Sequence, residues 1–275
     1  MKRIICSLIV TIMLLAAATT VYAQPASEST YDQAINEQRI VSPLQLDFIE
    51  KYFDVDLDNS NISIISTAPE NVARSMVSTQ ANKKAIKCVS ELSDTELQVT
   101  IIVPMLENEN GRLVNAFELR PNYLTEASLM ATLSTSTSNG SIPDLYYRVI
   151  GNYSREVISS NYVYRFLSAQ FKWWRKDSSS SYKVNRFILN AAVCGDLYDT
   201  SFNLIKEDYE KMKTLDKSSP TIDTYYNTGT IMAAQGNVVT VSGFHQGATM
   251  DWEYWVYNSD GSNVRDIGSH KVFGP

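Results

Sequence analysis

Histidine and cysteine are scarce in this chain: only two histidines, His245 and His270, and three cysteines occur among 275 residues. The sequence contains no Gly-x-Ser-x-Gly elbow, no His-Glu-x-x-His zinc motif and no glycine-rich phosphate loop. Cys194 with one of the histidines could in principle form a thiol nucleophile and its base, but we interpret Cys194 as a structural residue at a strand end. These absences argue against a conventional enzyme and predict no cofactor and no metal site.

Basic residues are also in short supply, with 24 Lys and Arg against 30 Asp and Glu and a net charge of −6. Two of the basic residues, Lys2 and Arg3, lie in an N-terminal leader described next, and its removal would leave 22 basic residues and a net charge of −8. Nucleic acids and anionic membrane surfaces draw their protein affinity largely from Lys and Arg. The charge balance therefore disfavours both, and it suits a soluble protein kept apart by self-repulsion.

The leader has the three parts of a secretory signal peptide. Lys2 and Arg3 are followed by a 15-residue apolar region, Ile4 to Ala18, and by Val21-Tyr22-Ala23 before Gln24. The apolar region is shorter than the ~20 residues of a membrane span, and no later stretch approaches that length. The sequence predicts a signal peptide over 1–23 and a protein secreted to the extracellular space or periplasm, with no transmembrane anchor after cleavage.

Cleavage would leave two cysteines, Cys88 and Cys194. In an oxidising compartment they could form a disulfide, and closing a loop of about 100 residues would stabilise the fold by roughly 4–5 kcal/mol. Two buried free thiols are equally compatible with the sequence. A regular strand through Val193 would place Cys194 on the face opposite the apolar row.

Sixteen tyrosines and several alternating apolar runs favour strands over helices. The clearest alternation, Leu97 to Val103, predicts a half-buried strand limited by Pro104, with a turn at Asn110-Gly111 and a returning strand from Leu113 to Leu119. The ranges 162–175 and 183–193 predict a second pair of strands. The range 201–217 predicts a helix, because its apolar residues recur at helical spacing.

Turn signals at intervals of roughly 8–12 residues indicate a mainly β protein, an antiparallel β-sandwich that could be arranged like a jelly roll. We expect a signal peptide at 1–23, a partly helical or flexible N-terminal segment at 24–84 and a β-sandwich domain at 85–275. The helix near 201–217 would be an addition to that domain.

Aromatic residues near the C-terminus are the strongest candidates for binding a ligand. Neighbouring side chains of a strand point to opposite faces, so an exposed member of the Trp252 and Trp255 pair could stack on a sugar ring. The candidate ligand-binding residues are Trp252, Trp255, Tyr254, Tyr257, Asn258, Asp260 and Trp174. The charge balance favours a neutral ligand such as a glycan, and another extracellular protein is an alternative partner. The competing interpretation is that these rings belong to the core.

Two segments invite other functions. Aspartates at positions 54, 56 and 58 resemble a calcium loop, although Asn59 and Ile65 stand where an EF-hand needs Gly and Glu. Residues 127–141 could be an amphipathic hairpin of a β-pore, or a short helix capped by Thr125 and followed by a loop, which we favour. The sequence thus predicts a secreted binding or interaction module, with a secreted hydrolase and a β-pore-forming protein as alternatives.

Overall fold

The structure is a computed structural model. It describes residues 38–39, 42–53, 55, 60–67, 83–134, 142–176, 182–241, 246–258 and 261–274. Several positions singled out in the sequence lie outside these ranges: the signal peptide, the three aspartates near residue 56, residues 135–141, His245 and Asp260.

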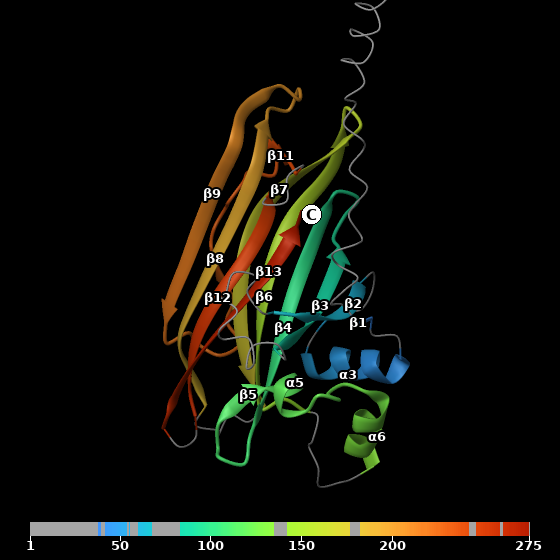
Figure 1. The fold of residues 1–275 in the computed structure, drawn as a ribbon, viewed down its shortest axis with the longest axis vertical. Helices are drawn as coiled ribbons and strands as arrows, with labels where there is room; N and C mark the ends of the chain where they lie inside the picture. The colour runs from blue at the N-terminus through green and yellow to red at the C-terminus, as the bar shows by residue number, and fades with distance from the viewer. Residues whose placement is uncertain are drawn as a thin grey trace, which may run out of the picture.

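Antiparallel strands form two facing layers (Figure 1). The first layer contains, in spatial order, β1 (Gln38–Arg39), β2 (Ser60–Ser66), β3 (Lys84–Glu91), β4 (Glu96–Glu107), β6 (Leu145–Ile158) and β7 (Asn161–Arg175), with β5 (Leu113–Asn115) beside the end of β4. The second layer has the order β9 (Leu204–Ser218), β8 (Lys183–Tyr198), β12 (Gly247–Tyr257) and β13 (Asn263–Phe273). This confirms the mainly β, sandwich-like prediction. Strands of the first layer follow the chain order, so that layer is a meander and not the jelly-roll arrangement.

Two short strands connect the layers at the free edge of β7. β10 (Tyr226–Asn227) pairs with β7, and β11 (Val238–Thr240) pairs with both β7 and β8. Between them, Ile231 and Met232 donate backbone hydrogen bonds to carbonyls of Leu167 and Phe166. The segment after β9 therefore runs along β7 as an irregular strand and closes one side of the sandwich.

Aromatic side chains fill the space between the layers. Phe171 of β7 stacks on Phe187 of β8 with ring centroids 4.0 Å apart, and Tyr147 of β6 meets Tyr254 of β12 at 4.5 Å. The strands over 162–175 and 183–193 are confirmed, but the expectation that they pair is wrong. They face one another across the core because β8 hydrogen-bonds to β9 and β12 instead.

In the described part of the chain, three helices pack on the outer face of the first layer toward one end of the strands (Figure 1): α3 (Pro43–Phe53), α5 (Ala116–Leu119) and α6 (Glu126–Ser134). Phe48, Ile49 and Phe53 of α3 pack in a second apolar cluster with outward side chains of the first layer, including Ile86 and Ile102. Pro43 occupies the first helical position, which suits its missing N–H. The expected segment boundary after residue 84 falls at the first residue of β3, which pairs with β2 along the length of β2.

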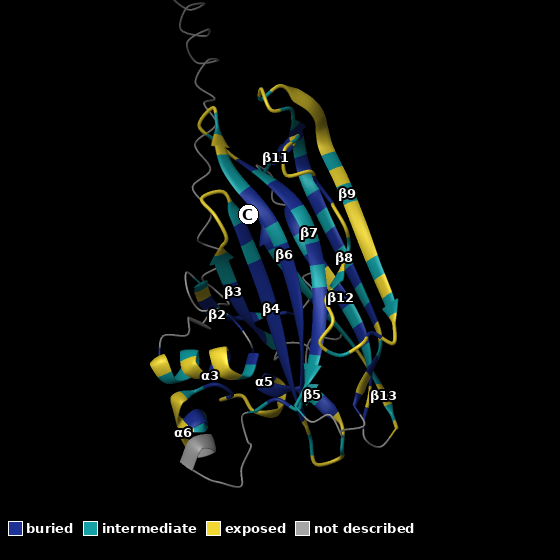
Figure 2. Ribbon diagram, turned by 180° about the vertical axis from the view of Figure 1, so that it is seen from behind, coloured by how far each residue is buried: buried dark blue, intermediate teal, exposed yellow. Residues whose placement is uncertain are grey.

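The outer face of the second layer carries no such cover among the described residues. Along β8, buried and half-exposed residues alternate strictly from Phe187 to Tyr198. Figure 2 shows β9 as largely exposed along the edge of this layer.

The helix predicted over 201–217 is wrong, because the chain from Leu204 to Ser218 forms β9. The apolar stripe of the helical interpretation is divided: Leu204, Ile205 and Met212 are exposed, whereas Tyr209 and Leu215 are partly buried against the core. Pairing with the long edge of β8 satisfies the backbone of this segment and overrides its helical spacing.

Two smaller expectations also change. β4 continues through Pro104 to Glu107, with Pro104 opposite Tyr146. The returning strand stops at Asn115, whose side chain accepts a hydrogen bond from the Phe117 N–H at 3.0 Å and so begins α5. In the part of 127–141 that the structure describes, α6 confirms the helical interpretation, with Thr125 Oγ1 accepting from Ser128 N–H. No helix in the described ranges is long and apolar enough to cross a membrane.

Candidate functional site

Trp252 and Tyr254 are core residues, with side chains only 2 % and 1 % exposed. The Trp252 indole donates a hydrogen bond from Nε1 to the Tyr147 hydroxyl at 2.9 Å, and the Tyr254 hydroxyl donates to Asp266 at 2.9 Å. Gly268 leaves room for the indole, because a Cβ there would lie 2.4 Å from the ring. Burial raises the pKa of the Tyr254 hydroxyl well above its ordinary range. Neither ring is available to a ligand at the surface.

Trp255 stands on the exposed outer face, but two guanidinium groups cover its ring. Arg186 on β8 and Arg265 on β13 lie directly opposite Trp255 on either side, at 5.3 and 5.7 Å from the ring centroid. Asp216 pairs with Arg186, and Glu253 pairs with Arg265. A sugar could stack on Trp255 only by displacing a cation that is already held by the ring and a carboxylate.

The remaining candidate ligand-binding residues also divide into buried and exposed ones. Asn258 is buried and fully used, since Oδ1 accepts from the Leu113 N–H and Nδ2 donates to Ser262 Oγ, both at 2.9 Å. Trp174 lies on the helical side, stacked on Tyr146 at 5.1 Å. Tyr257 alone among these described residues is an exposed ring at the end of its strand, 40 % exposed.

The cysteines and His270 do not form a site. Both thiols are free: Cys88 is buried under the helical layer, and Cys194 faces outward from the second layer. The disulfide is therefore absent, because the two thiols lie on opposite outer faces of the sandwich. His270 lies opposite the buried Met250 and so points inward, away from Cys194. Among the described residues no three His, Cys, Asp or Glu side chains gather as metal ligands.

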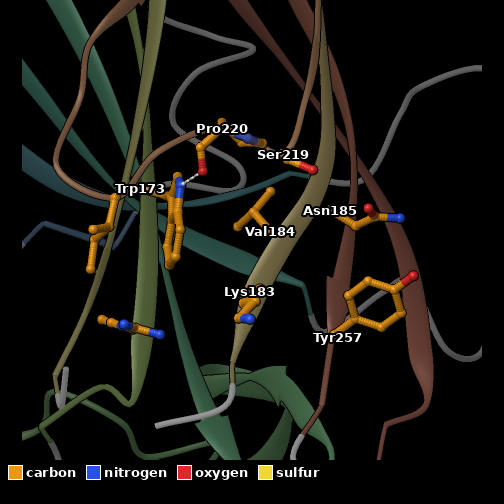
Figure 3. Close-up of a pocket in the computed structure, with 9 residues that line it drawn as sticks. Trp173, Lys183, Val184, Asn185, Ser219, Pro220 and Tyr257 are labelled. Atoms are coloured by element: carbon orange, nitrogen blue, oxygen red, sulfur yellow. Dashed lines mark hydrogen bonds between the residues drawn. The ribbon is translucent and has the colours of Figure 1, made fainter. Parts of the chain in front are cut away.

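A pocket of about 250 Å³ opens at the end of the sandwich near Tyr257 (Figure 3). We call it the end pocket. Trp173 lies on one side of it, Asn185 and Tyr257 on the other, and Val184 and Lys183 between them. Nine residues of the described part of the chain line it: Trp173, Arg175, Lys183, Val184, Asn185, Ser219, Pro220, Ile222 and Tyr257. They come from β7, β8, β12 and the segment that follows β9.

Backbone irregularities gather at this pocket. Arg186 and Val184 pair with consecutive residues of β12, so Asn185 is the extra residue of a β-bulge. Ser219, whose N–H donates to the Asn185 carbonyl at 2.6 Å, has a left-handed φ of 46°, which is unusual for a residue other than glycine. Bulges and left-handed residues concentrate at functional sites, where they aim side chains that a regular strand would place elsewhere.

Hydrogen bonds fix the wall of the pocket in this shape. Trp173 is buried, and its Nε1 donates to the Pro220 carbonyl at 2.9 Å. Its own carbonyl accepts from the Asp223 N–H at 2.9 Å, and Lys172 forms an ion pair with the Asp223 carboxylate at 2.6 Å. Arg175 is anchored in turn by a hydrogen bond from Nη1 to the Tyr182 carbonyl at 3.1 Å. These bonds hold Trp173 and Arg175 in place on one side of the pocket, whereas Lys183 and Tyr257 are exposed.

Sequence reasoning did not find this site, apart from Tyr257. The sequence predicts only that Trp173 lies in the strand at 162–175 and that Lys183 and Asn185 lie in the strand at 183–193. The useful signal was the ambiguous stretch 217–223, where a proline and several polar residues follow the predicted helix. The strands beside this stretch are set by pairing between segments that are far apart in the sequence, so its neighbours could not be predicted.

Comparison of the chain with protein-family models, with curated proteins and with solved structures found no match. A function for this protein therefore has to come from the chemistry of its own residues.

Proposed function

We propose that this protein is a secreted, extracellular binding module whose ligand site is the end pocket. The observation that carries the proposal is the coincidence of the cavity with the bulge at Asn185 and the left-handed Ser219. The volume is below the ~300–1,000 Å³ typical of sites for drug-sized ligands, so it suits a single ring. A buried indole, an exposed phenol and nearby amide, hydroxyl and ammonium groups match the surface of one sugar residue.

The aromatic outer face supports the proposal less well than the pocket does. Trp255 is already covered by Arg186 and Arg265, and Trp252 is inside the core. Tyr257 is one of the aromatic residues that the sequence singled out, and it also lines the end pocket. We therefore place the glycan site at the end of the strand and not on its outer face. A modest affinity is expected, because stacking adds only about 1 kcal/mol beyond the burial of area.

Binding to a panel of immobilised glycans, followed by titration of the best binder, tests this function. Tyr257→Ala should weaken binding at least several-fold without changing the melting temperature, because the ring is at the surface. Tyr162→Ala is the matched control: its ring is 43 % exposed and lies at the β6–β7 turn, outside the pocket lining. Equal loss in both variants, or no binding to any glycan, would contradict the proposal.

A further inference from the structure

The end pocket has a local charge opposite in sign to that of the whole protein. Among the described residues its lining contains the cations Arg175 and Lys183 and no carboxylate, whereas the full chain has a net charge of −6. A charge surplus of this kind within one cavity acts at short range, since salt screens charges beyond about 8 Å at physiological ionic strength. The long-range field of the protein therefore does not decide what the pocket holds.

Lys183 is the cation on which the selectivity of the pocket depends. It lies on β8 beside the bulge, opposite Tyr257 in the register of the strands, and it is exposed. No carboxylate among the described residues forms an ion pair with it, unlike Lys172 and Arg186 nearby, which pair with Asp223 and Asp216. An ammonium group at the rim of a cavity remains able to form a charge-assisted hydrogen bond, which is about twice as strong as a neutral one.

We infer that the ligand of the end pocket is a sugar-sized ring bearing one anionic substituent, a carboxylate or a sulfate, which Lys183 and Arg175 recognise. The ring would lie against Tyr257, and the anionic group would be directed toward the two cations. Asn185 and Ser219 would donate to the remaining oxygens. This inference rests on the proposed function and replaces the neutral glycan expected from the overall charge.

Titration of the full-length secreted protein with three soluble probes tests it: galactose, galacturonate and galactose 6-sulfate. We expect both anionic sugars, or one of them, to bind at least tenfold more tightly than galactose, and the affinity to fall as sodium chloride is raised. The preferred anion identifies the substituent. Lys183→Gln should remove most of that preference, Lys183→Arg should restore it, and Lys206→Gln, an exposed lysine at the far end of β9, should leave it intact.

Two results would overturn the inference, and they are distinguishable. If all three sugars bind equally and Tyr257→Ala weakens binding to each of them, the pocket binds sugars without distinguishing their charge, and only the proposed function is retained. If none binds up to millimolar concentration, both the inference and the sugar-binding function fail. Unchanged melting temperatures for the Lys183 variants are required in either case, and the exposed position of this residue makes them the expected result.

Discussion

The two outer faces of the sandwich are built differently. The first layer is covered by α3, α5 and α6, and β4 is consequently buried on both sides for most of its length. The second layer is open among the described residues, and β8 alternates between buried and half-exposed positions. The same strand geometry therefore carries two sequence patterns: a nearly continuous apolar run, as from Thr100 to Leu106, where both faces are covered, and strict alternation where one face meets water.

The largest expected effect comes from removing the helical cover. Phe53 is fully buried and meets Tyr146 edge-on at 5.2 Å. Phe53→Ala should lower the free energy of unfolding by about 3–5 kcal/mol, as truncation of a buried aromatic does. Ile188→Ala on the open face should cost about 1 kcal/mol or less. Urea denaturation measures both changes, and similar losses in the two variants would show that the faces are not different.

The free energy of unfolding should depend on pH, because His270 is enclosed between the two layers. Its Nε2 is buried without a hydrogen-bond partner in the described structure, and burial, helped by the positive charge of Lys87 on β3, lowers the pKa of His270 from 6.5 to about 3. The unfolded chain therefore takes up a proton near pH 6.5 while the folded protein does not. The contribution of neutral His270 to stability is complete above pH 6.5 and is lost as the pH falls toward 3.

This dependence can be isolated by comparing the unfolding free energy of the natural chain and of His270→Leu across pH 7 to pH 3. The natural chain should lose more stability over that range than the variant, because the carboxylates that drive general acid denaturation are common to both. Parallel curves would rule out a buried neutral histidine.

The positions of several strands could be predicted from the sequence, but their pairing could not. The apolar residues from Leu97 to Val103 and around Phe187 are local patterns, so both strands could be predicted, but β4 is buried on both faces from Val99 to Leu106 and not half-buried as expected. The pairing of the strands could not be predicted, because some fifty residues separate β8 from β12. No short-range sequence pattern indicates that Trp255 lies between two arginines on the neighbouring strands. For the same reason Lys183 and Ser219 could not be recognised as parts of one pocket.

The edge strand β9 was misread because its charges lie on both faces. Lys211 and Lys213 stand opposite the buried Val193 and Ala191 and so share their inward face, while Glu210 and Met212 point outward. Inward charges at an edge make the addition of another strand costly, since that strand would bury them. The two lysines interrupt the inward row between Tyr209 and Leu215, so β9 lacks the unbroken apolar alternation by which a strand is recognised.

Removing the inward charges of β9 should have a smaller effect, which is on self-association of the protein. Lys211→Val combined with Lys213→Val should raise the apparent mass of the protein with increasing concentration in light scattering, because the edge could then accept a second strand. Met212→Val, on the outward side of the same strand, serves as the control. An unchanged mass in the double variant would mean that the lysines do not protect the edge.

The contrast between a covered and an open face is tested most directly by the two cysteines, one on each. Burial raises the pKa of the Cys88 thiol to about 12, whereas Cys194 is partly exposed, its pKa raised by partial burial and by Glu210, Asp208 and Asp196. Iodoacetamide at mildly alkaline pH, followed by peptide mapping, should label Cys194 in the folded protein and leave Cys88 unmodified until urea is added. Equal labelling of the two thiols in the folded protein, or a peptide in which they are joined by a disulfide, would contradict the account.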